Sequence, residues 1–272
     1  MEVLGIIPAR GGSKGIPGKN IKLLSDKPLI DYSIKAAQNS KLLNKFIVST
    51  DSDEIANICK LSGAEVPFIR PEEFARDDTP DRPMILHALE YLKENQNYIP
   101  DMVVLLRPTT PFKTGAIIDE CITKLCENKE YSSLRTVTQT EGVHHPYWMF
   151  SNKDGFLKTF IDGINLTEYH RRQLLPECYR LNGVVDVLRT DNLLKYNDIY
   201  GDKVGYISLS EYDSIDIDNQ FDFDLCEYIL RNVKSKISGL CPNVKLKIGE
   251  AYASSKTKVR EEINESSKIK YI

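Results

Sequence analysis

Three cationic side chains follow the first apolar segment of the chain. Residues 3–7 form a short apolar run that predicts a buried strand, and the loop ARGGSKGIPGKN comes directly after it. Neighbouring glycines let backbone N–H groups approach a ligand, and Arg10, Lys14 and Lys19 add positive charge. These features predict a loop that binds a triphosphate. The alternative is an exposed basic turn between a strand and a helix.

This loop differs from two common phosphate-binding motifs. A Walker A loop requires G-x4-G-K-[ST], but here Asn20 follows Gly18 and Lys19, and Ser13 replaces the first glycine. Ser13 also occupies the second glycine position of the dinucleotide motif G-x-G-x-x-G. The sequence therefore disfavours a dinucleotide-dependent oxidoreductase.

Two carboxylates in the segment SIDID are candidates for binding a metal. In an extended segment, Asp216 and Asp218 point to one face while Ile215 and Ile217 point to the other. Paired carboxylates suit Mg²⁺, which keeps several waters and shares oxygens with substrate phosphates. The alternative is that one aspartate caps the helix expected from Asn219 and the other is solvated.

A group of arginines is suited to binding a carboxylate, because guanidinium groups form bidentate pairs with such anions. Arg171 and Arg172 precede Arg180 in the stretch RRQLLPECYRLNG. The alternative is a solvated, charged loop.

Alternating strand and helix patterns must position these groups. Apolar runs predict strands at residues 3–7, 46–49 and 102–106, and helical spacing predicts helices at residues 28–39, 83–92 and 114–126. This alternation predicts an α/β fold with a mostly parallel sheet flanked by helices. The loops ARGGSKG, TDSDE and RPTTPF follow strands, so we expect them on one rim of the sheet, where such folds bind ligands.

The pattern changes after residue 131. We expect residues 1–131 and 181–237 to form the core, with a helix over 219–237, and residues 132–180 to be an insertion that leaves the sheet as an arm. Residues 238–272 are polar and rich in lysine, which predicts a peripheral tail.

Composition excludes several classes of protein. The 272 residues include 36 Lys+Arg and 39 Asp+Glu, a net charge of −3 that disfavours a nucleic-acid binder. No stretch approaches the ~20 apolar residues that span a bilayer, so we expect no membrane segment. The six cysteines form no C-x-x-C pair, which favours a reducing cytoplasm.

On these residues the chain resembles the acylneuraminate cytidylyltransferase family, the CMP-sialic acid synthetases, over residues 3–235. The opening IIPARGGSKGIPGKNIK is typical of that family, and LRPTTP corresponds to its usual LQPTSPLR motif. The resemblance implies a Rossmann-like nucleotidyltransferase fold. It also implies a nucleotide site made of Pro8, Ala9, Arg10, Gly11, Gly12, Ser13, Lys14, Lys19, Asn20, Arg70, Pro108 and Thr109. The sugar site that it implies consists of Arg107, Arg172, Gln173, Arg180, Asn182 and Asp186.

The family's reaction transfers CMP from CTP to the anomeric hydroxyl of a nonulosonate and releases pyrophosphate. By this resemblance the catalytic residues are Arg10, Lys14, Lys19, Asp216 and Asp218, and the two aspartates bind the Mg²⁺ cofactor. The family is typically a homodimer whose arm reaches the partner's site. A cytidylyltransferase for Kdo and a catalytically inactive nucleotide-binding module are the alternatives.

Two departures from the family pattern bear on the sugar. Arg107 stands where the family usually has Gln, and Asp186 stands where many sialic acid enzymes have Tyr. Asp186 could accept hydrogen bonds from the sugar, or the two residues could pair with each other. Both departures predict a nonulosonate other than N-acetylneuraminate, of the legionaminic or pseudaminic type.

Overall fold

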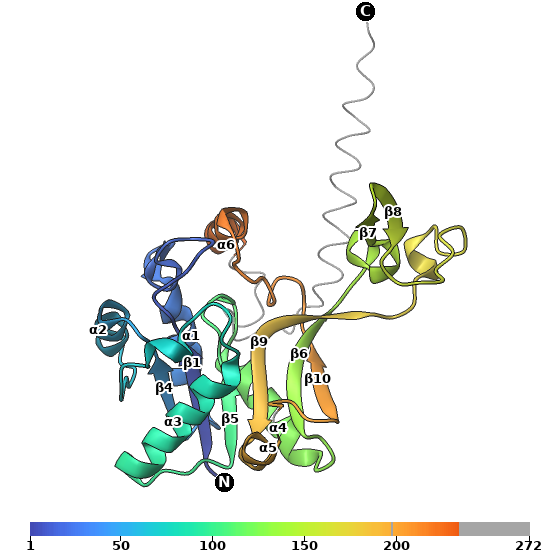
Figure 1. The fold of residues 1–272 in the computed structure, drawn as a ribbon. Helices are drawn as coiled ribbons and strands as arrows, with labels where there is room; N and C mark the ends of the chain where they lie inside the picture. Colours follow the sequence, from blue (N-terminus) through green and yellow to red (C-terminus); the bar gives the residue numbers. More distant parts are fainter. Residues whose placement is uncertain (197, 234–272) are drawn as a thin grey trace, which may run out of the picture.

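A six-stranded sheet forms the centre of the molecule in the computed structural model, which describes residues 1–196 and 198–233 (Figure 1). The strand order is β10-β6-β9-β5-β1-β4. β1 runs parallel to β4 and β5, and β10 runs parallel to β6, whereas β9 is antiparallel to both its neighbours. The predicted, mostly parallel sheet is therefore confirmed. The strands are β1 (Val3–Pro8), β4 (Lys45–Ser49), β5 (Met102–Leu105), β6 (Ser133–Gln139), β9 (Tyr179–Arg189) and β10 (Val204–Ser208).

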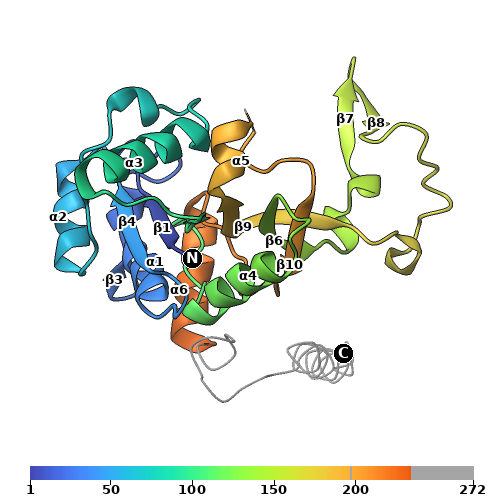
Figure 2. The same ribbon diagram turned by 90° about the horizontal axis from the view of Figure 1, so that it is seen from below.

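Helices cover both faces of the sheet. Figure 2 shows α3 and α5 on one side and α1 and α4 on the other. Along β1, Val3 and Ile7 belong to one apolar cluster while Leu4 and Ile6 belong to the other, because successive side chains point to opposite faces. The helices are α1 (Leu29–Gln38), α2 (Asp53–Leu61), α3 (Asp81–Gln96), α4 (Gly115–Glu127), α5 (Thr190–Lys195) and α6 (Gln220–Asn232).

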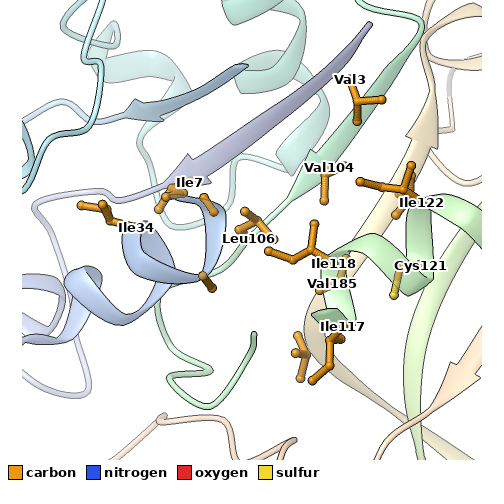
Figure 3. Packing of buried hydrophobic residues seen from close by; sticks show 14 of the residues in the cluster. Val3, Ile7, Ile34, Val104, Leu106, Ile117, Ile118, Cys121, Ile122 and Val185 are labelled. Atoms are coloured by element: carbon orange, nitrogen blue, oxygen red, sulfur yellow. The ribbon is translucent and has the colours of Figure 1, made fainter. Parts of the chain in front are cut away.

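The cluster under α1 and α4 is the larger of these two. Figure 3 shows Ile34 of α1 and Ile118 of α4 packed near Ile7 and Leu106. These contacts hold the ends of β1 and β5 in place, and the loops ARGGSKG and RPTTPF follow those ends. Local signals set the helix starts: Ser52 and Thr114 cap α2 and α4 by accepting from backbone N–H groups.

Short elements complete the described chain. Two hairpins stand apart from the main sheet, one close to the first loop and one in the arm. They consist of β2 (Leu23–Leu24) with β3 (Lys27–Pro28), and β7 (Phe150–Lys153) with β8 (Phe156–Thr159). The 3-10 turns are η1 (Lys19–Ile21), η2 (Glu72–Phe74), η3 (Gly142–His144), η4 (Pro146–Trp148) and η5 (Arg172–Leu174).

The arm begins later than the sequence predicts. β6 lies between β10 and β9 inside the main sheet, so the segment that leaves the sheet is 140–178 rather than 132–180. Figure 1 shows this segment, with β7 and β8, extending away from the core. The sequence did not predict β6 as a strand of the main sheet because β6 contains several polar residues. Its buried hydroxyl groups bond to partners that are distant in sequence, which no local pattern reveals. Thr136, for example, donates to Asn182, 2.7 Å away.

The last described helix is α6 (Gln220–Asn232). The predicted helix over 219–237 begins as expected, but α6 ends at Asn232. Residues 234–237 and the expected tail, 238–272, lie outside the described residues.

Candidate active site

The loops that follow β1 and β5 meet at one rim of the sheet, as predicted. They border a cavity of about 450 Å³, which the segment 70–84 and Asp218 close on other sides. Several predicted site residues line it: Pro8, Arg10, Ser13, Lys14, Lys19, Asn20, Arg70, Arg107, Pro108, Thr109 and Asp218. Ala9, Gly11 and Gly12 do not line it, and Ala9 is fully buried at the end of β1.

The loop after β1 is held by hydrogen bonds to its own backbone. Gly11 N–H donates to Asp51 Oδ1 over 2.9 Å, which ties the loop to the TDSDE segment after β4. Asn20 is buried, and its Nδ2 donates to the carbonyl oxygen of Arg10 over 2.9 Å. The loop shape is therefore fixed by the protein, which favours a preformed binding site.

The same loop packs against the segment that carries the two aspartates. Lys19 Nζ donates to the carbonyl oxygen of Ile217 over 2.6 Å and lies 4.0 Å from Asp218 Oδ1. A Cβ atom added to Gly15 would lie 2.3 Å from the carbonyl oxygen of Asp218, so only glycine permits this contact. The cationic loop and Asp218 thus share one side of the cavity, whereas Asp216 does not line it.

Arg10 and Lys14 are two of the three cations of this loop that line the cavity, and both pair with Asp77. Arg10 Nη1 lies 2.8 Å from Asp77 Oδ1, and Lys14 contacts the other carboxylate oxygen. The hydrogen bond from Lys14 and the two positive charges lower the pKa of Asp77. Sequence reasoning missed Asp77, because nothing in ARDDTP distinguishes it from Asp78.

Arg70 lines the cavity and has unpartnered donors in the buried part of its side chain. Its side chain is buried, and its Nε and Nη2 have no hydrogen-bond partner among the described residues. Burial lowers the pKa of this guanidinium, and Asp51, 3.9 Å away, partly opposes the effect. Unsatisfied buried donors are costly, so this arrangement suits a ligand that brings an acceptor.

Asp216 and Asp218 lie in the loop between β10 and α6 rather than in a strand. The N–H of Ile217, between them, donates to the carbonyl oxygen of Thr109 over 2.8 Å. Asp216 Oδ1 is buried without a hydrogen-bond partner. Burial and the charge of Asp216 raise the pKa of Asp218. The alternative of helix capping is wrong, because Asn219 caps α6.

These carboxylates fit a partly hydrated magnesium ion. An unbonded buried carboxylate oxygen beside a second carboxylate is a donor set of the type that Mg²⁺ accepts. In the part of the chain that the structure describes, no group of three His, Cys, Asp or Glu side chains could hold a metal. The remaining ligands would have to be waters and substrate oxygens.

Arg107 is fixed by carboxylates on two sides. Its Nη1 lies 2.6 Å from Asp186 and its Nη2 lies 2.6 Å from Asp81. Asp186 is fully buried and also accepts from Arg135 over 3.0 Å and from Tyr200 over 3.3 Å. Burial alone would lower the pKa of Arg107, but the neighbouring carboxylates outweigh burial and raise it.

This cluster corrects the expectation for Asp186. Its carboxylate is engaged by protein groups and does not line the cavity, so it orients Arg107 instead of facing a ligand. The pairing of Arg107 with Asp186 was one of the two alternatives that the sequence left open. Asp81, Arg135 and Tyr200 were missed, because they come from three separate segments that only the fold brings together.

The other predicted sugar residues do not reach this cavity within one chain. Arg172 and Gln173 line a separate pocket of about 390 Å³ on the arm, where Arg172 lies 3.8 Å from Glu141. Arg180 is exposed on β9. Asn182 is buried and its side chain bonds Thr136 and Thr138 of β6, so it serves the sheet and is not free for a ligand.

A family model described as cytidylyltransferase matches residues 4–232. The chain belongs to this cytidylyltransferase family. It is therefore a nucleotidyltransferase, and the expected family and enzyme class are confirmed.

Several curated proteins are similar to this nucleotidyltransferase along most of its length. Post-translational flagellin modification protein B of Campylobacter coli is 31% identical over 86% of this chain and 98% of its own. CMP-N,N'-diacetyllegionaminic acid synthase of Campylobacter jejuni is 32% identical over 86% of this chain and 98% of its own. N-acylneuraminate cytidylyltransferase of Escherichia coli is 30% identical over 92% of this chain, which spans 57% of that longer protein.

Solved structures show the same fold. A CMP:2-keto-3-deoxy-manno-octonic acid synthetase complexed with CTP has a TM-score of 0.62 at 12% identity, covering 86% of this chain and 100% of that one. A 4-diphosphocytidyl-2C-methyl-D-erythritol synthase from Anaerococcus prevotii has a TM-score of 0.57 at 15% identity, covering 85% and 99%. Within residues 1–196 and 198–233, no helix is long and apolar enough to cross a membrane.

The contact of Asp77 with Arg10 and Lys14 leads to a prediction. A polyphosphate must displace this carboxylate, so Asp77→Asn should tighten the binding of inorganic triphosphate by roughly two- to fivefold. Isothermal titration calorimetry without divalent metal measures this, with Asp78→Asn as the control. Weaker binding by Asp77→Asn would show that the carboxylate orients Arg10 and Lys14 rather than competing for them.

Proposed function

We propose that the protein transfers CMP from CTP to the anomeric hydroxyl of a sialic-acid-like nonulosonate and releases pyrophosphate. One observation carries this proposal: the cationic loop and Asp218, the neighbour of Asp216, share one side of a single cavity, and Lys19 joins the two segments. Relatives named as legionaminic acid, pseudaminic acid and acylneuraminate enzymes support the class of sugar.

Arg10, Lys14 and Arg70 are proposed to bind the nucleotide. Arg10 and Lys14 exchange Asp77 for the triphosphate and neutralise charge that develops during transfer. The unpartnered N–H groups of Arg70 offer donors for a carbonyl oxygen of the base. Because transfer needs little covalent work from the protein, positioning and charge neutralisation supply most of the catalysis.

The reaction is a displacement at the α-phosphorus of CTP. A bond forms between that phosphorus and the sugar hydroxyl oxygen, while the bond to the bridging oxygen of the β-phosphate breaks. Pyrophosphate leaves, and the hydroxyl proton passes to solvent. Asp216 and Asp218 would hold Mg²⁺, which when bound supplies positive charge next to the phosphates.

The sugar side of the cavity is proposed to include Arg107. Asp186 and Asp81 hold its guanidinium in one orientation, and a fixed cationic fork favours acceptor and anionic substituents more strongly than a neutral amide does. This supports a modified nonulosonate over N-acetylneuraminate. The sequence relatives favour a nonulosonate over Kdo, because the likeness to the Kdo enzyme shows the fold alone.

We also propose a homodimer in which the arm of one chain completes the cavity of the other. Arg172 and Gln173 line a pocket on the arm, apart from their own chain's cavity. The arm also exposes large apolar side chains, with Phe156 77%, Leu157 78% and Phe160 68% exposed. Such apolar surface is typical of a protein interface.

We propose that the protein works in the cytoplasm. The described cysteines are free, which suits a reducing compartment.

Pyrophosphate release tests the function directly. With CTP saturating, we expect release only when a nonulosonate is present, and kcat/KM should be higher for legionaminic- or pseudaminic-type sugars than for N-acetylneuraminate. Absence of release with every nonulosonate would refute the proposed reaction. If N-acetylneuraminate is the best substrate, Arg107 does not set specificity.

Removing one metal carboxylate should abolish most turnover. Asp216→Asn keeps the shape of the side chain but weakens its hold on Mg²⁺, so we expect kcat to fall by about 100-fold or more. Asp224→Asn, on the exposed face of α6, makes the same chemical change outside the site and is the control. Unchanged kcat at saturating Mg²⁺ would remove Asp216 from the metal site.

Subunit mixing tests the shared site. In co-expressed Lys14→Ala and Arg172→Ala chains, one site of each hybrid dimer contains both native residues, so about one quarter of wild-type activity should return. Lys14→Ala with Asp216→Asn is the control, because both changes then fall in the core. A monomeric mass by light scattering at assay concentration would exclude the arrangement.

A further inference from the structure

A buried lysine stands directly behind the turn that follows β5. Lys113 is 4% exposed, and its Nζ donates to the carbonyl oxygens of Arg107 over 2.6 Å and of Thr110 over 2.5 Å. A third bond runs to Ser33 Oγ of α1 over 3.0 Å. Three acceptors match the three N–H donors of an ammonium group, so the charged form is the one that fits.

The turn held by this ammonium connects two parts of the cavity. At its start, Arg107 lies between Asp186 and Asp81 with its side chain at the cavity. At its middle, the carbonyl oxygen of Thr109 accepts the N–H of Ile217, the residue between the two metal carboxylates. A shift of the turn would therefore move both the Arg107 side and the aspartate segment.

The charge of Lys113 is not needed for packing. Burial lowers its pKa to about 7, although Asp216 opposes this effect and Arg107 adds to it. A methionine of similar length would fill the same space without a desolvation cost, because unbranched apolar side chains adapt to core gaps. Three polar acceptors gathered around a buried Nζ atom indicate a role beyond filling volume.

We propose that Lys113 is a positioning residue whose ammonium fixes the 107–110 turn and, through it, both Arg107 and the Asp216–Asp218 segment. The proposal rests on the proposed function for the identity of the ligands that these groups meet. Lys113 itself does not line the cavity, so it acts only through the turn. The loop of Arg10 and Lys14 is held by other contacts, to Asp51 and Asn20, and should keep its shape without Lys113.

The test compares Lys113→Met with two controls. Lys35→Met removes an exposed lysine that bonds Gln38 on the surface of α1. Ser33→Ala removes one acceptor of the ammonium and a long bond, 3.4 Å, to the carbonyl oxygen of Arg107, but it keeps the ammonium and both of its carbonyl bonds. In Lys113→Met, we expect the Mg²⁺ concentration for half-maximal activity and the KM for the sugar to rise by about 10- to 100-fold. Both controls should stay within about twofold of the wild type.

Binding without turnover supplies a second readout. Calorimetry with CTP in EDTA should give Lys113→Met a Kd within about twofold of the wild type, because the phosphate loop is intact. Mg²⁺ binding to the CTP complex should weaken by the same factor as the activity constant. This measurement separates the two proposals, because a wild type that binds Mg²⁺ and CTP but releases no pyrophosphate refutes only the reaction.

A purely structural role predicts a different result. Lys113→Met would then lower the melting temperature but keep wild-type Mg²⁺ and sugar constants below that temperature, which would overturn the proposal. If Lys113→Met does not fold, the same Mg²⁺ and sugar constants are measured for Lys113→Gln, since its amide retains N–H donors without the charge. A selective rise in the Mg²⁺ and sugar constants of that variant supports positioning, and unchanged constants overturn it.

Discussion

The contact between Lys19 and the backbone of Ile217 holds the two charged parts of the site together. Lys19 belongs to the first loop of the chain and Ile217 to the last loop before α6, and a 2.6 Å hydrogen bond joins them. Gly15 permits the backbones to approach closely, as no other residue could. The cations of the first loop and the carboxylate of Asp218, which come from opposite ends of the described chain, thereby line one cavity.

Three cations around this cavity have carboxylate partners before any ligand binds. Asp77 pairs with both Arg10 and Lys14, and Asp186 and Asp81 pair with Arg107. The two arrangements differ in burial. Lys14 is largely exposed and Asp77 is partly exposed, so the pair is weak and exchangeable, whereas fully buried Asp186 holds Arg107 in one place. Arg10 and Lys14 thus have a carboxylate partner that a ligand can replace, whereas Arg107 keeps one orientation.

The sequence predicted the rim of the sheet better than the partners of its side chains. Apolar runs located β1, β4 and β5, and the loops after them were placed together correctly, because strand ends are a local signal. The position of β6, the burial of Asn182 and the pairing of Asp186 with Arg135 were missed. Each depends on hydrogen bonds between β6 and β9 or on contacts across the sheet, which no local pattern encodes.

Burial also explains why a polar residue in a family position does not have to meet the substrate. Asp186 stands in the middle of β9, where side chains alternate between faces, and Arg135 on the neighbouring strand β6 lies directly opposite. A carboxylate there must be paired, because an isolated buried charge is very costly. Arg135 and Arg107 meet that requirement together, and only Arg107 also lines the cavity. A substitution at Asp186 therefore acts on the ligand through Arg107. It changes how the guanidinium is held, because Asp186 itself does not line the cavity.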